Sequence, residues 1–207
     1  MLRAVDRAIL SGDEATGATN ISDYANGSIA GTEWYQVCDG LRDWAFTNSD
    51  TYDVGTLAYD DIRSVLALMG TAGKYGVNPA DLVLFCDPAT LSLMTDLDEC
   101  VTVDKFGPKA TILTGMLGAI RGIPIVGSEE YDLTDANGHI HNTAGNNTKG
   151  SFVIANKKGA MIGYKRAVTL VVDRVPFSDL HYLVASVRFD IQFREAGVAA
   201  LGYDITI

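Results

Sequence analysis

The sequence predicts an α+β fold, because helical patterns lie mostly early in the chain and strand patterns mostly late. Apolar residues make up 47% of the 207 residues, and charged residues 20%. This composition is typical of a folded chain with a hydrophobic core, in one large domain or two small ones. The clearest patterns are an apolar helical stripe within 57–75 and a strictly alternating segment at 187–194.

Three segments in the first part of the chain have apolar residues at helical spacing. The first covers residues 2–10 and ends at Ser11-Gly12-Asp13. After an expected loop at 13–31, an amphipathic helix with Trp and Phe on one face is predicted within 34–46. The clearest helix covers 57–75 and has acidic residues in its first turn. Its apolar stripe consists of Ile62, Val65, Leu66, Met69 and Ala72.

A short strand and a capped helix come next. The apolar run Leu82–Cys86 is typical of a strand that is buried on both faces. Asp87 as N-cap and Pro88 at the first helical position predict a helix that continues to about Leu97. A loop is expected at 98–118. A strand follows at 123–126, in which Pro124 favours an edge or a bulge.

The last third of the chain predicts strands. Residues 127–150 are rich in turn residues and contain Asn137-Gly138, a strong hairpin signal. Three short apolar runs predict strands at 152–155, 160–164 and 168–172. In segment 187–194, Val, Phe and Ile alternate with Arg, Asp and Gln, which predicts a strand with one buried and one solvated face.

The net charge of −10 argues against nucleic-acid recognition as the main function, because a protein that neutralises phosphates needs a basic face. The charge is uneven: residues 1–60 hold 3 basic and 10 acidic side chains, 61–150 hold 6 and 11, and 151–207 hold 7 and 5. An acidic N-terminal part and a mildly basic C-terminal part would suit subunits that associate head to tail, the basic part of one against the acidic part of the next. The alternative is ordinary solvated surface.

We expect neither a secreted nor a membrane protein. The Asn-x-Ser/Thr triplets at 20–22, 26–28 and 146–148 match the glycosylation pattern, but without a secretory signal they indicate only polar loops. Cys38, Cys86 and Cys100 form neither a disulfide framework nor a zinc motif, and they predict reduced thiols. The first ten residues are not expected to be a signal peptide, since three of them are charged. Each apolar run is shorter than the roughly 20 residues that a membrane helix requires.

Two patterns that resemble binding loops fail when their spacing is checked. Gly70–Lys74 lacks the Gly and the Ser or Thr that complete a phosphate-binding loop, and it lies where a helix dipole is negative. The Asp and Asn residues within 132–137 suggest a calcium loop. Counted back from Gly138, however, that loop would begin at Leu133 and end at Ala144, which are not ligands.

Candidate catalytic and metal-binding residues are few. His139 and His141 would share a strand face, but zinc needs three or four ligands and the third histidine is the distant His181. The carboxylate pairs at 98–99 and 129–130 are sequence neighbours that would not face a common bond. There is no G-x-S-x-G nucleophile motif. We therefore expect no catalytic residue, no cofactor and no metal.

The order and spacing of these segments, rather than any single motif, carry a family resemblance over nearly the whole chain. The helix end at 4–13 leads through helix 59–75 to Asn78–Leu84 and Asp87–Thr90. The later strands include Gly122-Ile123-Pro124-Ile125-Val126, 152–165 and 187–194. In this order they resemble the C-terminal two-thirds of a tailed-phage major capsid protein with the Hong Kong 97-like fold.

The resemblance implies an axial-type domain over residues 50–180 and a partial peripheral-type domain formed by 1–50 and 181–207. It also implies that the family's N-terminal arm, its extended hairpin and most of its spine helix are lacking before Met1. Those parts make many contacts between subunits, so this chain alone is expected to form monomers or small rings rather than closed shells.

The function that the resemblance implies is structural: a subunit of an icosahedral phage or prophage capsid that associates with other copies of itself around DNA. Its expected location is the host cytoplasm before assembly and the virion afterwards. Other capsid or scaffold proteins are further expected partners, whereas a membrane and tight sequence-specific nucleic-acid binding are not. Two alternatives remain: an encapsulin-like shell protein of a cargo compartment, and an unrelated cytosolic enzyme or binding domain with His139, His141 and His181 in one pocket.

Overall fold

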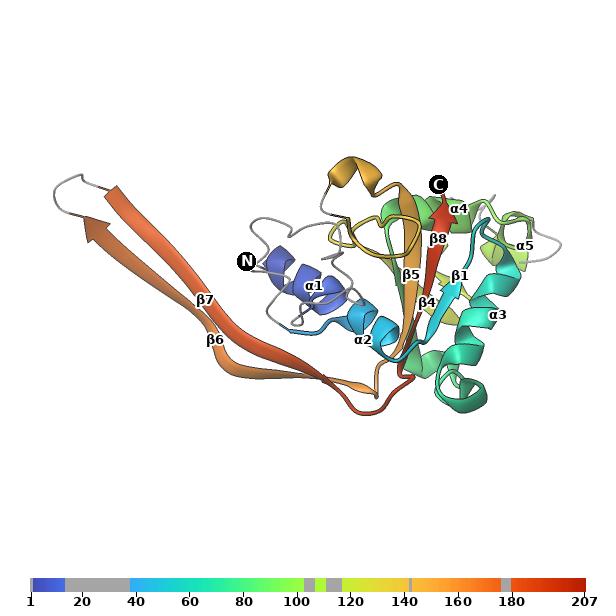
Figure 1. Ribbon diagram of the computed structural model, residues 1–207, viewed down its shortest axis with the longest axis horizontal. Helices are drawn as coiled ribbons and strands as arrows, with labels where there is room; N and C mark the ends of the chain where they lie inside the picture. The colour runs from blue at the N-terminus through green and yellow to red at the C-terminus, as the bar shows by residue number, and fades with distance from the viewer. Residues whose placement is uncertain (1, 14–37, 103–106, 111–116, 142, 176–179) are drawn as a thin grey trace.

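The computed structural model consists of a body with helices on both faces of a sheet, and a long hairpin that extends away from this body (Figure 1). The predicted α+β class is therefore confirmed. The structure describes residues 2–13, 38–102, 107–110, 117–141, 143–175 and 180–207.

The body is built on a six-stranded mixed sheet with the order β1-β8-β5-β2-β4-β3. Its strands, in chain order, are β1 (Thr51–Asp53), β2 (Leu82–Cys86), β3 (Ala119–Ile120), β4 (Ile123–Gly127), β5 (Lys149–Asn156) and β8 (Ala199–Thr206). The pairs β1–β8 and β2–β4 are parallel, and the other three pairs are antiparallel. The predicted strand at 82–86 is confirmed at both ends.

Alternate residues of the central strands supply two separate apolar layers, one on each face of the sheet. Leu84, Phe152 and Ala200 lie in the layer that contains residues of α3 (Tyr59–Leu68) and α4 (Pro88–Thr95). Val153 and Leu201 lie in the opposite layer, with residues of α1 (Leu2–Ser11) and α2 (Leu41–Thr47). Both faces of the sheet are thus buried, as expected for near-continuous apolar strands.

The early helices agree with the sequence in part. Helix α1 confirms the prediction for 2–10. Helix α2 begins only at Leu41. The aromatic helix predicted within 34–46 is therefore confirmed only from Leu41 onward. The expected loop at 13–31 lies almost entirely outside the described residues, as do residues 34–37.

The predicted helix at 57–75 is too long at both ends. Helix α3 ends at Leu68, and Ala72 is exposed in a 3-10 turn rather than on the helical stripe. The reason is backbone conformation: Gly70 has φ +72°, Ala72 φ +56° and Gly73 φ +74°, so the chain turns left-handed three times within four residues. Such residues cannot continue a right-handed helix.

Strand β4 explains how Pro124 is accommodated. The prediction of an edge or a bulge is wrong, because β4 has β2 on one side and β3 on the other. The β2 ladder begins only at Ile125, beyond the proline. On the side of β3, Ile120 and Ile123 form the pair that closes a two-residue turn. The next pair, Ala119 and Pro124, is a non-hydrogen-bonded pair, so Pro124 needs no backbone N–H toward β3.

The sequence did not predict β8, although it lies between two other strands. Three of its first four residues, Ala199, Ala200 and Gly202, are small and have low strand propensity. Packing explains their presence: a Cβ on Gly202 would lie 2.7 Å from the Phe152 ring. The small residues let strand and ring approach closely.

Two long strands, β6 (Ala160–Val175) and β7 (Leu180–Phe193), form the projecting hairpin. The predicted strands 160–164, 168–172 and 187–194 are parts of this one feature. In the last of these, the expected alternation is confirmed, because Ile191 is buried whereas Asp190 and Gln192 are exposed.

The remaining elements are short. The loop predicted at 98–118 contains helix α5 (Asp98–Val101), and the predicted helix from Asp87 ends at Thr95, not at 97. The turn at Asn137-Gly138 is confirmed by a hydrogen bond from Asp135 N to His139 O of 2.9 Å. In the part of the chain that the structure describes, 3-10 turns lie at Thr71–Gly73, Pro79–Asp81, Gly107–Lys109 and Ala144–Asn146.

The core layer under α3 yields a stability prediction. Ile62 is fully buried, whereas Leu66, on the same predicted stripe, is only partly buried. Ile62→Ala should therefore lower the free energy of unfolding by about 2–5 kcal/mol through an uncollapsed cavity, and Leu66→Ala by clearly less. Urea unfolding of the two variants measures the difference. Equal losses of unfolding free energy in the two variants would show that burial in the structure does not determine which of the two side chains stabilises the fold more.

Candidate functional site

The three histidines do not form a site. His139 stacks on Phe46 with ring centroids 4.5 Å apart. The Nδ1 atom of His141 accepts a hydrogen bond of 2.9 Å from Thr143 N. His181 lies near the tip of the hairpin, where it is paired with Arg174 in the strand register. The pocket that would favour an enzyme or binding domain is therefore not built by these residues.

The acidic residues near the suspected calcium loop have local roles. The side chain of Asp135 accepts a hydrogen bond of 3.0 Å from Asn137 N, and that of Asn137 accepts one of 2.9 Å from His139 N. These contacts are Asx turns, which stabilise the loop by themselves. The carboxylates of Glu129 and Glu130 both lie within 3.6 Å of the exposed Arg3 guanidinium.

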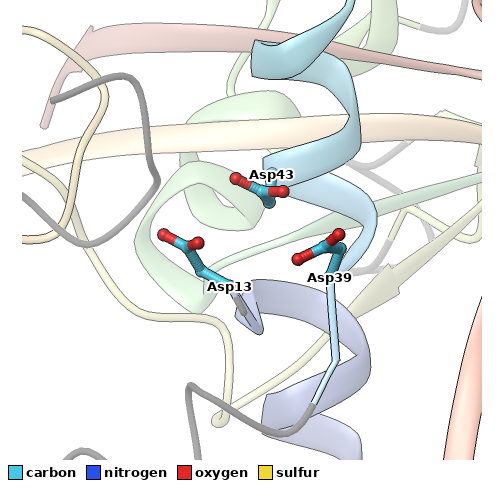
Figure 2. Close-up of side chains that lie close together, drawn as sticks. All are labelled: Asp13, Asp39 and Asp43. Atoms are coloured by element: carbon cyan, nitrogen blue, oxygen red, sulfur yellow. The ribbon is translucent and has the colours of Figure 1, made fainter. Parts of the chain in front are cut away.

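Three carboxylates that the sequence analysis did not single out converge next to α2. Asp13 follows α1, Asp39 precedes α2, and Asp43 lies in its first turn (Figure 2). Their closest oxygens all lie within 4.8 Å of one another. Calcium prefers six to eight oxygen ligands, and each of these residues has further polar interactions. The cluster alone therefore does not define a metal site.

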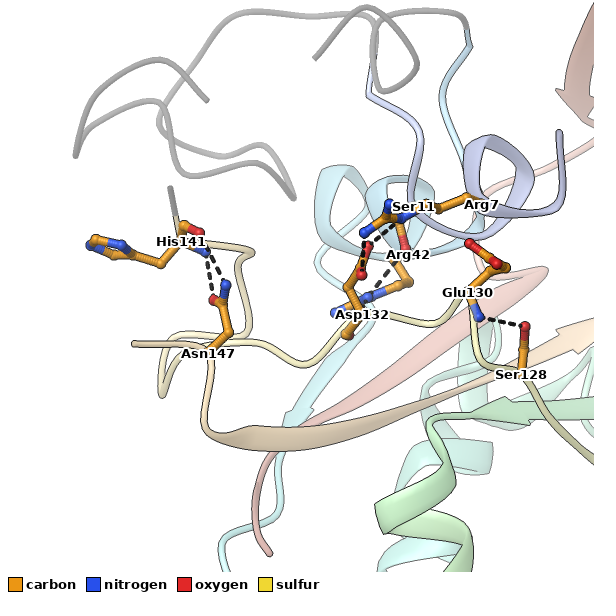
Figure 3. Close-up of polar contacts among 8 residues, drawn as sticks. All are labelled: Arg7, Ser11, Arg42, Ser128, Glu130, Asp132, His141 and Asn147. Carbon is orange, nitrogen blue, oxygen red and sulfur yellow. Dashed lines mark hydrogen bonds and ion pairs between the residues drawn. The ribbon is translucent and has the colours of Figure 1, made fainter. Parts of the chain in front are cut away.

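A buried arginine, Arg42, connects the N-terminal helices to the sheet, and Figure 3 shows its contacts with Ser11 and Asp132. The side chain of Arg42 is fully buried, and its Nη1 atom donates to Ser11 Oγ at 3.2 Å and to the carbonyl of Asp132 at 2.9 Å. Its Nη2 atom donates to Ser151 Oγ at 3.3 Å, on β5. Close by, the half-buried Arg7 of α1 pairs with the Asp132 carboxylate, with Nε and Oδ2 2.9 Å apart. These contacts fix the position of α1 and α2 over the sheet.

Tyr131 lies beneath this arginine, with the guanidinium carbon 4.5 Å from the ring centroid. Burial raises the pKa of Tyr131 to about 12, against an opposing effect of the Arg42 charge. Cys86, on β2, is equally inert: burial raises the pKa of its thiol to about 12. All three cysteines are buried and outside any disulfide bond, as predicted. Burial therefore keeps the Tyr131 hydroxyl and the Cys86 thiol protonated at neutral pH.

The hairpin β6–β7 carries most of the exposed large apolar side chains of the described residues. Ten large apolar side chains on it are exposed by at least 43%, namely Met161, Ile162, Tyr164, Val168, Leu170, Val171, Val172, Tyr182, Leu183 and Val184. Only three other large apolar residues of the described chain are comparably exposed: Val77, Val126 and Ile207. An apolar patch of this kind marks an interaction surface. The sequence analysis identified the strands but not their exposure.

The hairpin is attached firmly at its base. Phe193 stacks on Trp44 of α2 with ring centroids 4.8 Å apart. Ile191 is only 4% exposed and packs with Ala8 of α1 and Cys38. Beyond this base the strands extend without cover from the body (Figure 1). Within the described residues, no helix is long and apolar enough to cross a membrane.

Comparison with known proteins gives the fold. No protein-family profile and no curated protein matches the sequence. Among solved structures, one from Mycobacterium phage Che8 matches 77% of this chain and 57% of its own, with 15% identity and a TM-score of 0.56. The mature capsid of bacteriophage PhiM1 matches 73% and 50%, with 13% identity and a TM-score of 0.54.

A third similar structure, the capsid of an empty GTA particle, matches 98% of this chain and 62% of its own, with 14% identity and a TM-score of 0.55. The chain therefore spans between half and two-thirds of the length of these solved subunits. The expected Hong Kong 97-like capsid fold is confirmed by these matches.

The arginine network generates a second prediction. Arg42→Met should lower the free energy of unfolding by about 1–3 kcal/mol or more, because the hydroxyls of Ser11 and Ser151 lose a buried donor. Arg63→Met is the control, since that arginine is 66% exposed and its 3.9 Å pair with Asp60 is worth little. Denaturant unfolding of both variants measures the contrast. A loss for Arg42→Met no greater than for the control would contradict it.

A third prediction concerns pH. The unfolded chain ionises Tyr131 near its ordinary pKa of 10, whereas the native state holds that proton until about pH 12. The native state thus binds more protons in this window, and its stability should fall as pH rises from 10 to 12. Tyr131→Phe should flatten this fall in a thermal-melting series, and an unchanged slope would exclude Tyr131 as a contributor.

Proposed function

We propose that this chain is a structural subunit of an icosahedral phage or prophage capsid, which associates with other copies of itself into a shell around DNA. The observation that carries the proposal is the hairpin β6–β7, which extends from a capsid-type fold with large apolar side chains exposed. A capsid subunit needs extended edges for its neighbours and has no need of a catalytic pocket. The role that we propose is therefore non-enzymatic.

The energetics of the hairpin support self-association. A two-stranded hairpin on its own is marginally stable in water, and side chains such as Val172 and Leu183 stay 61% and 67% exposed in the single chain. Covering a fully exposed residue of this kind contributes about 1.5–3 kcal/mol. A neighbouring subunit would supply that cover, and repeated contacts of one kind build rings and closed shells.

The charge is compatible with DNA as the enclosed cargo and not as a tightly bound ligand. A net charge of −10 repels phosphates at long range. We propose that the chain makes no sequence-specific nucleic-acid contact and no membrane contact. We further propose that it resides in the host cytoplasm before assembly and in the virion afterwards, with other capsid or scaffold proteins as additional partners.

The two-domain division remains part of the proposal: an axial-type domain over 50–180 and a peripheral-type part formed by 1–50 and 181–207. The strand pairing bears on its boundary. Strand β8 belongs to the second part by this division but completes the sheet of the first. Any domain boundary must therefore leave β8 with β5.

The fourth prediction tests self-association. Sedimentation velocity of the purified chain from about 1 to about 100 μM should show reversible oligomers, since this range covers association free energies of roughly 5.5–8 kcal/mol. Negative-stain microscopy should show rings of five- or six-fold symmetry. A monomer at every concentration would show that the contacts of this chain alone do not suffice for association, whereas a two-fold dimer that does not grow would contradict the capsid function.

A further inference from the structure

One cross-strand pair of the hairpin brings two arginines directly opposite each other. Arg166 of β6 pairs with Arg188 of β7, and the register of β6 shifts on both sides of Arg166. Directly opposed side chains lie on the same face of a sheet, with Cβ atoms about 4.5–5.5 Å apart, and like charges in such a pair are destabilising. A neutral pair would therefore serve the hairpin better, so folding alone does not account for these two cations.

The neighbouring side chains extend this positive surface. Nη2 of Arg166 donates a hydrogen bond of 3.3 Å to the hydroxyl of Ser186, which places the guanidinium on the same face of the hairpin as Arg188. Lys165 and Arg188 line one hollow of about 360 Å³ beside Gly163. All three cations are exposed, and we call Lys165, Arg166 and Arg188 the basic cluster.

The described residues provide no counter-charge for the basic cluster, because every ion pair among them involves other cations. Asp190 is the one acidic residue within 163–169 and 186–192. Its carboxylate lies at the same hollow but accepts a hydrogen bond of 3.0 Å from Gln192. With three basic side chains against one acidic, this part of the hairpin has a charge of +2 in a chain of net charge −10.

The basic cluster lies at a distance from the acidic body. Ile191 is the buried residue at the base of the hairpin, and Arg188 lies three residues farther out along β7. At about 3.3 Å per residue, this separation is about 10 Å, which exceeds the Debye length of about 8 Å at physiological ionic strength. Repulsion of an anion by the body is therefore largely screened at the cluster, whereas direct contacts with the cations are not.

We infer that the basic cluster contacts the phosphate backbone of double-stranded DNA without reading its sequence. The inference rests on the proposed capsid function, in which the shell encloses DNA, and it names the residues that touch this cargo. Lys and Arg neutralise phosphates, and hydroxyl and amide side chains donate further hydrogen bonds to them. The face around the cluster offers such donors in Thr169, Ser186 and Gln192. A phosphate beside both guanidiniums would also offset their mutual repulsion.

The chemistry of this face favours nucleic acid over a protein partner. Protein interfaces are centred on buried apolar or aromatic anchors, and charged residues are depleted in their cores. The ladder pairs on this face, from Thr169–Ser186 through the arginine pair to Gly163–Asp190, contain no large apolar side chain. Binding to a phosphate backbone needs no such anchor, because the release of counterions supplies free energy.

Variants of the opposed pair test the contact. Arg166→Gln with Arg188→Gln removes both guanidinium charges, whereas Arg166→Lys with Arg188→Lys keeps the charge. The control is Arg63→Gln with Lys109→Gln, which removes the same charge from two exposed positions of the body. The glutamine pair also ends the like-charge repulsion across the ladder, so the hairpin should stay folded. Thermal melting of each variant checks this.

The readout is binding of the full chain to fluorescent DNA duplexes of two unrelated sequences, measured over a series of salt concentrations. The wild type should bind both duplexes alike, with an affinity that falls as salt rises. The glutamine pair should weaken binding about tenfold or more and lower the slope of log affinity against log salt by about 1.8, because two phosphate contacts are lost. The lysine pair and the control should stay close to the wild type.

Three results would overturn the inference. They are a wild type that binds neither duplex at low salt, a glutamine pair that binds DNA as well as the control does, and a strong preference for one of the two sequences. A glutamine pair that keeps DNA binding but loses self-association in sedimentation would assign the cluster to carboxylates of a second copy instead. A wild type that associates but does not bind DNA would contradict this contact and leave the proposed self-association intact.

Discussion

One antiparallel ribbon, formed by residues 149–175 and 180–206, organises this molecule. Its inner part is the β5–β8 pair in the middle of the sheet, and its outer part is the β6–β7 hairpin. Between them, Asn156 N donates to Val198 O and Arg194 N to Gly159 O, both at 2.8 Å. The exposed hairpin is therefore the continuation of buried core strands. It cannot fold back onto the body without breaking ladder bonds beside the sheet.

Several buried polar contacts hold the body around this ribbon. Asp87 caps α4 by accepting a hydrogen bond of 2.8 Å from Thr90 N, and it also accepts one of 3.1 Å from Ser151 N on β5. Arg42 reaches the hydroxyl of the same Ser151 from α2, on the opposite face. A helix on each face is thus tied to one residue of the ribbon. Buried polar contacts of this kind favour one arrangement of the layers.

The sequence predicted the parts of the fold where local chemistry and packing agree. Leu82–Cys86 is apolar throughout because both its faces are buried, and Asp87-Pro88 is a local capping signal that α4 follows. Strand β8 was missed because its small residues have low strand propensity, and the closeness of Phe152 to Gly202 is visible only in three dimensions. The length of the hairpin was missed for a different reason. Two bulges in β6 reset its alternation between residues 164 and 169, so one strand gave the pattern of two.

For the candidate interaction surface, the hairpin β6–β7, the sequence predicted strands with an apolar face but not which part of that face is exposed. Alternation at 187–194 shows that one face of the strand is buried, but it does not show whether the cover belongs to the same chain. The structure separates the two cases: α1 and α2 cover the base, while the distal residues of the same face stay exposed. For a subunit of a shell this arrangement couples folding to assembly. In the proposed shell, the sheet of one chain would fix the direction of the ribbon, and a neighbouring copy would bury what that chain leaves exposed. Hydrophobic stabilisation of the outer ribbon would then be gained on association.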